Sequence, residues 1–83
     1  MEFQVRLKLK AQRELNNLSP KDYCRAMEAI SLIAVNPFAN KKLRGEYRGC
    51  YSCRFWPYRI IYKIYKKELI IIIIDIGHRQ NIY

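Results

Sequence analysis

The sequence is short of the features that mark secreted and membrane-spanning small proteins. It has three cysteines, an odd number for a disulfide framework, and 83 residues suffice for one modest core without such bridges. Reduced thiols fit an intracellular protein. The longest aliphatic run, residues 69–74, has six residues, whereas about 18 are needed to cross a bilayer. Residues 1–3 show no charged-then-apolar leader, so we expect no export signal and a cytoplasmic location.

Acidic residues are also scarce. Seven Asp and Glu face 16 Lys and Arg, which gives a net charge of +9. A charge of this size bears on partners rather than on fold, and nucleic acid is the leading candidate. A membrane surface is disfavoured because no stretch joins an apolar helical face to a basic one. Simple solubility and an acidic protein partner remain alternatives.

Metal ligands of the usual spacing are few. Cys50 and Cys53 form a lone CxxC, and Cys24 with His78 would complete a Cys₃His set for zinc. In an extended strand, however, residues three apart point to opposite faces, so the two thiolates of the CxxC would not reach one ion. We therefore expect no metal and no cofactor.

Hydropathy patterning predicts one domain over residues 1–83 with four strands and two helices. Residues 3–7 alternate apolar and polar as a strand does, and residues 8–17 change to the spacing of an amphipathic helix. Ser19 and Pro20 suit the start of a second helix, which Asn36-Pro37 ends. Further strands are predicted at 50–55, 58–65 and 69–76.

The last of these strands determines the expected topology. Residues 69–76 are apolar on both faces, so this strand should lie inside the sheet with a neighbour on each side. Residues 3–7 form the only strand left to be its second neighbour. We expect the α+β fold class, with the order β-α-α-β-β-β and a helix hairpin packed on one face of a four-stranded, mostly antiparallel sheet. The other face should be open and should carry the function.

Strand alternation places basic residues on that other face. Arg54 alternates with Cys53 and Phe55, and Arg59 and Lys63 alternate with apolar neighbours, so these three cations should share one side. Arginines hold phosphate groups bidentately and stabilise the charge of a phosphorane-like transition state. A tyrosine near such a cluster becomes more acidic and can serve as a general acid or base. Attack of an RNA 2′-OH on its own phosphate needs these groups and no metal.

Four segments of the sequence resemble the RelE/ParE toxin family. They are Leu-Arg-Gly at 43–45, Tyr-Ser-Cys-Arg-Phe at 51–55, Tyr-Arg-Ile-Ile-Tyr at 58–62 and Gly-His-Arg-Gln-Asn-Ile-Tyr at 77–83. The resemblance covers essentially the whole chain. It implies a toxin of a toxin–antitoxin pair, held inactive by a cognate antitoxin. Many such toxins cut messenger RNA in the ribosomal A site.

The resemblance also implies roles for individual residues. Arg54 and Arg59 match the basic residues at the scissile phosphate, and Arg79 matches a C-terminal arginine that acts on the transition state. Tyr83 matches a terminal tyrosine that acts on the 2′-OH or stacks on the base. His78 occupies a variable position and is a further catalytic candidate. Three more basic residues are expected to bind RNA: Lys63, Arg48 and Arg44.

The expected function is therefore a metal-independent endoribonuclease toxin that acts on messenger RNA at the ribosome. It would meet operator DNA only through the antitoxin complex and would not bind a membrane. Ser52 stands where many RNA-cutting members are basic, and Trp56-Pro57 replaces a small polar turn. Two alternatives are a ParE-like toxin that inhibits DNA gyrase and an inactive RNA-binding relative.

Overall fold

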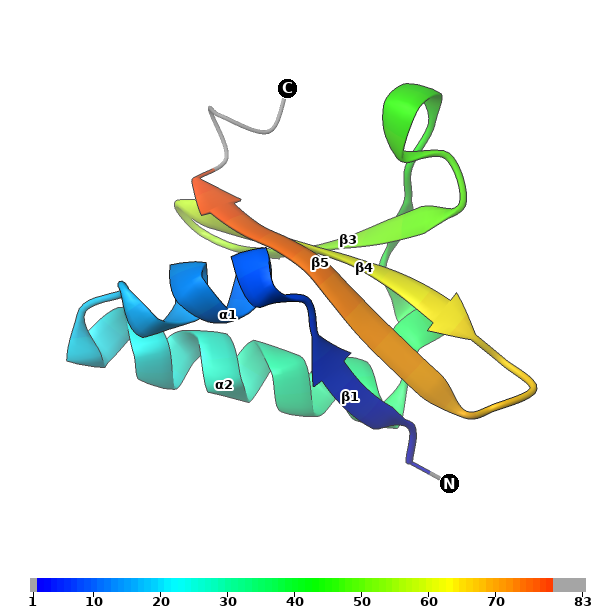
Figure 1. Cartoon of the computed structure of the whole chain (residues 1–83), viewed down its shortest axis with the longest axis horizontal. Coiled ribbons are helices and arrows are strands. Elements are labelled where there is room, and N and C mark those ends of the chain that lie inside the picture. Colours follow the sequence, from blue (N-terminus) through cyan, green and yellow to red (C-terminus); the bar gives the residue numbers. More distant parts are fainter. Residues whose placement is uncertain (1, 79–83) are drawn as a thin grey trace.

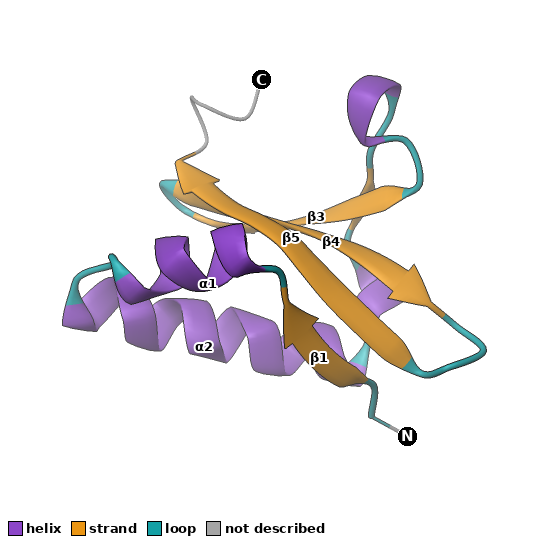
Figure 2. Ribbon diagram, in the orientation of Figure 1, coloured by secondary structure: helices purple, strands orange, loops and turns teal. Residues whose placement is uncertain are grey.

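The computed structural model describes residues 2–78. Two helices form one layer and a sheet forms the other (Figure 1). Figure 2 shows the same arrangement by element type. The elements are β1 (Gln4–Leu7), α1 (Leu9–Asn16), α2 (Pro20–Val35), the 3-10 turn η1 (Pro37–Ala39), β2 (Lys41–Lys42), the 3-10 turn η2 (Gly45–Tyr47), β3 (Cys50–Phe55), β4 (Tyr58–Tyr65) and β5 (Ile70–His78).

The sheet has the strand order β1-β5-β4-β3-β2. Strand β1 is parallel to β5, and the other pairs are antiparallel. The predicted fold class is confirmed, and so is the position of β5 between β1 and β4. The sheet has five strands rather than the predicted four, because Lys41 and Lys42 pair with β3. A two-residue strand is too short to show an alternating pattern in the sequence.

Helix α2 begins and ends where its sequence signals predicted. The Ser19 hydroxyl oxygen accepts a hydrogen bond from the backbone N–H of Asp22 at 3.2 Å, and Pro20 occupies the first turn. This cap satisfies one of the N–H groups that a helix leaves unpaired at its start. The helix ends at Val35, before Asn36-Pro37.

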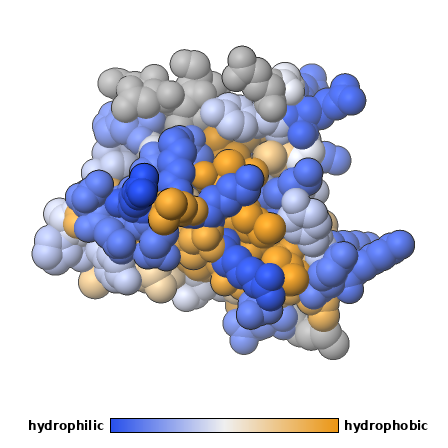
Figure 3. All heavy atoms as spheres, viewed as in Figure 1, coloured by the Kyte–Doolittle hydropathy of each residue, from blue (hydrophilic) through white to orange (hydrophobic). Residues whose placement is uncertain are grey.

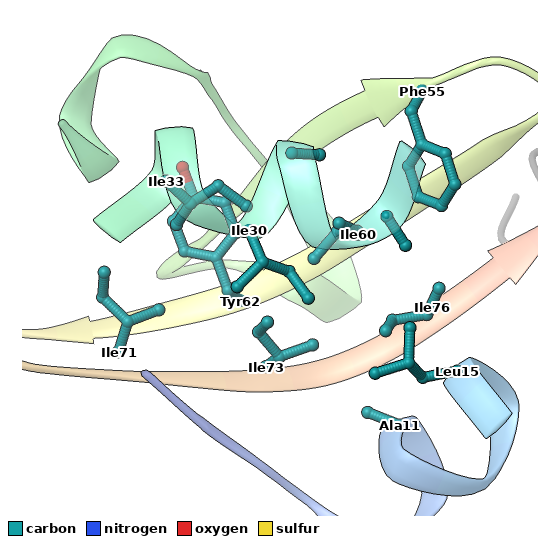
Figure 4. Close-up of a cluster of buried hydrophobic side chains, with 12 residues drawn as sticks. Ala11, Leu15, Ile30, Ile33, Phe55, Ile60, Tyr62, Ile71, Ile73 and Ile76 are labelled. Atoms are coloured by element: carbon teal, nitrogen blue, oxygen red, sulfur yellow. The ribbon is translucent and has the colours of Figure 1, made fainter. Parts of the chain in front are cut away.

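The main core lies between the helices and the sheet (Figure 4). Ala11 and Ala26 are fully buried, and their small side chains let both helices approach the strands closely. Tyr62 is buried at the edge of this core, where its hydroxyl donates a hydrogen bond to the Pro37 carbonyl at 2.6 Å. The same hydroxyl accepts one from the Asn40 amide at 3.0 Å. Desolvation raises the pKa of Tyr62 to about 12.

The outer surface of the helix layer is mixed. In the view of Figure 3, hydrophilic side chains cover much of α1, and hydrophobic surface shows between them. Tyr23 and Met27 of α2 are among its exposed hydrophobic side chains. Within residues 2–78, no helix is long and apolar enough to cross a membrane.

Two neighbouring residues of α2 test the assignment of the core. Ile33 has an exposed fraction of 0%, whereas that of Leu32 is 70%. We predict that Ile33→Ala lowers the free energy of unfolding by about 2–5 kcal/mol, because it removes buried methyl groups and leaves a cavity. Leu32→Ala, the matched control, should change it by about 0.5 kcal/mol or less. Urea unfolding measures both, and equal losses would contradict the packing of α2.

Candidate nucleic-acid interface

Two arginines lie side by side on the outer face, by which we mean the side of the sheet away from α1 and α2. Arg54 of β3 is paired directly with Arg59 of β4. Their strand neighbours Phe55 and Ile60 belong to the core under the helices, so both arginines belong to the opposite side. Side chains paired in this way begin about 5 Å apart. The predicted common side for these two cations is confirmed.

The two guanidinium groups differ in exposure. Arg54 is exposed, whereas Arg59 has an exposed fraction of 1%. Arginine is rarely buried to this degree. Its guanidinium group keeps its charge when desolvated, and a fixed charge in a region of low dielectric attracts an anion more strongly than one in water. Arg59 therefore adds positive potential beside Arg54, which is the exposed group that an anion would meet first.

The outer face is less open than the sequence predicted. Cys50 and Ile61 are buried there, with Leu43, Tyr47 and Ile74 packed against them. The turn η2 and its flanking residues supply part of this cover, and Figure 1 shows η2 on the side of the sheet away from the helices. A contact between residues so far apart in the chain leaves no signal in local hydropathy. This cover could therefore not be predicted from the sequence.

Three further predicted RNA-binding residues are exposed. Lys63 lies four residues beyond Arg59 on β4, about 13 Å along the strand and on the same side of the sheet. Arg48 and Arg44 flank η2 and are exposed as well. The cations of the outer face therefore extend from the Arg54–Arg59 pair toward the other end of β4.

His78 is placed apart from the arginine pair. Strand β5 continues to His78, two residues beyond its predicted end, and His78 pairs with Tyr58. The two rings meet edge to face with centroids 5.8 Å apart. Alternation from the core residue Ile76 puts His78 on the helix side of the sheet. Its catalytic part remains a prediction, as do those of Arg79 and Tyr83, which lie outside the described residues.

A cavity of about 340 Å³ lies on the helix side, between α1 and the ends of β4 and β5. Tyr58 and His78 line it, together with three charged residues. Lys10 Nζ lies 2.9 Å from Asp75 Oδ2 and 3.9 Å from Glu14 Oε2. This charged group was not predicted from the sequence. Lys10 and Glu14 are four residues apart, about one helical turn, and this spacing could have predicted that these two side chains lie close together.

Desolvation and hydrogen bonds set the proton affinities around this cavity. Burial raises the pKa of Glu14, and the hydrogen bond it accepts from the Ile76 N–H opposes that rise. The hydrogen bond to Asp75 raises the pKa of Lys10, so its ammonium group stays charged. Burial also raises the pKa of Tyr58. Since the pKa of Tyr62 is raised too, these two phenols are poorly suited to act as general bases near neutral pH.

The cysteines of the CxxC lie apart, as alternation predicted. Cys50 belongs to the small cluster on the outer face, whereas Cys53 packs against the core under the helices. Burial raises the pKa of the Cys53 thiol, which keeps it protonated at neutral pH. Cys24 is exposed on α2. These thiols therefore do not form a common ligand set.

Comparison with known proteins places this geometry in a family. Residues 5–83 match the family model described as the ParE toxin of the type II toxin–antitoxin system parDE. Toxin RelG of Mycobacterium tuberculosis is 32% identical over 85 residues, which cover 100% of this chain and 98% of RelG.

Solved structures agree with this assignment. The toxin–antitoxin complex RelBE2 of Mycobacterium tuberculosis contains a chain with a TM-score of 0.86 and 30% identity, covering 95% of this chain and 100% of that one. The archaeal RelE–RelB complex of Pyrococcus horikoshii OT3 gives a TM-score of 0.80 and 25% identity, covering 95% and 97%. With its fold and nearly its whole length shared in this way, the chain belongs to the RelE/ParE family of toxins of type II toxin–antitoxin systems.

Proposed function

We propose that this toxin is an endoribonuclease that cuts messenger RNA without a metal ion. The observation that supports this most is the Arg54–Arg59 pair on the outer face, with one guanidinium group exposed and the other buried. Two fixed positive charges at neighbouring strand positions suit a phosphodiester, which gains a further negative charge in the transition state. The positive net charge of +9 favours any polyanion in addition.

The proposed reaction is an internal transfer within the RNA. A base removes the proton of a 2′-OH, whose oxygen attacks the adjacent phosphorus while the bond to the 5′-oxygen breaks. The leaving oxygen takes up a proton. The products are a 2′,3′-cyclic phosphate and a 5′-OH. Arg59 and Arg54 would neutralise the phosphate, Arg79 would stabilise the transition state, and Tyr83 would accept the 2′-OH proton.

The RNA strand would extend from this pair toward the other end of β4. Lys63, Arg48 and Arg44 are exposed along this direction and would contact further phosphates. Contacts of this kind fix the position of the strand without reading its bases. Messenger RNA held on the ribosome is the proposed substrate, which requires a cytoplasmic location.

A cognate antitoxin is the proposed protein partner. Two similar structures are complexes of a toxin of this family with its antitoxin. We expect the antitoxin to cover the outer face or to displace the C-terminal segment, since either would silence the proposed site. Contact with operator DNA would then come through the antitoxin complex.

Inhibition of DNA gyrase is the second candidate, because the matching family model is that of ParE toxins. A gyrase inhibitor has no need of an arginine pair and a terminal phenol arranged around a phosphate. The two functions differ in their products, since only the ribonuclease leaves cut messages in the cell.

The residues proposed to act on the phosphate can be tested one at a time. Arg54→Ala, Arg79→Ala and Tyr83→Phe should each reduce cleavage by about a hundredfold or more, because each removes a charge or a proton acceptor used in the transition state. Primer extension on cellular messages after induction measures the cuts, and growth curves measure arrest. Circular dichroism confirms that each variant is folded.

Arg13→Ala is the matched control, since Arg13 is an exposed arginine on α1, in the other layer. It should cut and arrest growth like the unaltered protein. Growth arrest that survives all three site variants, with gyrase supercoiling inhibited in purified form, would replace the ribonuclease proposal by the gyrase one.

A further prediction concerns the path of the RNA strand over the outer face. Binding of 2′-O-methyl RNA, which cannot be cut, should weaken as salt rises, and Lys63→Gln should reduce the slope of log K against log salt by about 0.7. The slope is measured by fluorescence anisotropy at salt concentrations from about 50 to 200 mM. Lys21→Gln, an exposed lysine at the start of α2, should leave it unchanged. Equal slopes for both variants would show that Lys63 does not contact the RNA phosphates.

A further inference from the structure

The edge of β5 that faces away from β4 is bordered first by a strand and then by a helix. Strand β1 pairs with residues Ile70 to Ile73 of β5 and no farther. The backbone N–H of Lys8 still bonds to the Ile73 carbonyl at 2.9 Å, and α1 begins at the next residue. From there, α1 lies along the end of β5 (Figure 1). The last residues of β5 therefore border a helix on this edge, where the first ones border a strand.

Side chains of α1 take over the contacts that a strand would make. Glu14 Oε1 accepts a hydrogen bond from the backbone N–H of Ile76 at 3.0 Å, as a strand carbonyl would. Lys10 pairs with Asp75, the preceding residue of β5, at 2.9 Å. We call Lys10, Glu14, Asp75 and Ile76 the α1 latch.

The α1 latch lies beside an irregularity in the pairing of β5. The pairing between β4 and β5 shifts here, because Ile61 pairs with Asp75 whereas Tyr62 pairs with Ile73. A bulge of this kind leaves a residue out of the ladder and re-aims the chain that follows. Gly77, one residue after the bond to Glu14, pairs with Arg59. The α1 latch therefore fixes Ile76, and the next residue, Gly77, pairs with the buried Arg59.

We propose that Glu14, supported by Lys10 through Asp75, is a positioning residue that holds the end of β5, as far as His78, in register with Arg59. This inference rests on the proposed function, which gives Arg79 and Tyr83 their parts in the reaction. A catalytic group displaced by about 1 Å loses roughly a hundredfold in rate. Glu14 thus acts from the helix side of the sheet on chemistry at the outer face.

Glu14→Ala and Glu14→Gln separate positioning from general stability. Alanine cannot accept the Ile76 N–H, whereas the amide oxygen of glutamine can. Glu28→Ala is the matched control, since Glu28 is an exposed glutamate on α2. Lys10→Ala tests the supporting pair without leaving a cavity in the core, because the Lys10 side chain is 67% exposed.

Amide hydrogen exchange by NMR gives the first readout. In Glu14→Ala, the Ile76 and Gly77 amides should exchange about tenfold faster, while the Ile71 amide in the middle of the sheet keeps its rate. Lys10→Ala should give a smaller change of the same kind. Glu14→Gln and Glu28→Ala should match the unaltered protein. An unchanged exchange rate at Ile76 in Glu14→Ala, or a uniform increase in exchange throughout β5, would contradict the proposal that Glu14 holds the end of this strand.

Cleavage of messenger RNA on purified ribosomes gives the second readout. Glu14→Ala should lower the single-turnover rate constant at least tenfold at an unchanged half-saturating ribosome concentration, and Glu14→Gln should restore most of it. A change in half-saturation alone, or no recovery with glutamine, would overturn the positioning role. If the unaltered protein does not cut, the proposed function and the positioning role both fall, and hydrogen exchange still decides whether Glu14 holds Ile76.

Discussion

Strand β5 is apolar on both faces, and burying it on both sides is the constraint on which the other elements depend. Its isoleucines can leave water only if one layer covers each face and a neighbour pairs with each edge. The helix pair covers one face and residues around η2 cover part of the other. Strand β4 takes one edge, while β1 and then α1 take the other. The folding of the first and last parts of the chain is thereby linked.

The same sheet also buries a charged residue, Arg59, on the side away from the helices. Taking a guanidinium group out of water is costly. Arg59 is nevertheless 1% exposed, between Arg54 of β3 and Gly77 of β5. Strands β4 and β5 make the most extensive contact in the fold, and Gly77 adds no side chain beside Arg59. A positive charge fixed in advance needs no rearrangement when negative charge develops on a substrate. Stability and the proposed chemistry thus depend on the same pair of strands.

Local signals in the sequence were sufficient for most of the fold. The Ser19 cap, the break at Pro37 and the alternation of β3 and β4 are properties of neighbouring residues, and the structure follows them. They also predicted that Arg54 and Arg59 lie on one side of the sheet, and the structure pairs the two residues directly.

Features that depend on distant contacts were not accessible in this way. Strand β2 has two residues, too few for a pattern, and η2 covers the outer face through contacts between segments far apart in the chain. The side of His78 depended on whether β5 ended at Ile76 or continued, because each added residue reverses the direction of the side chain. The bond from Glu14 to Ile76 joins residues 62 apart, and hydropathy says nothing about it.

The central claim is that the outer face directs a 2′-OH against its own phosphate, and the chemistry of the cut ends tests it most directly. Purified toxin should be incubated with ribosomes carrying a defined message, and the fragments should be analysed by mass spectrometry. The account predicts a 2′,3′-cyclic phosphate on one fragment, a 5′-OH on the other and no cut when the nucleotide before the scissile bond is 2′-deoxy. Cleavage of the deoxy-substituted message, or a 5′-phosphate on the product, would contradict it.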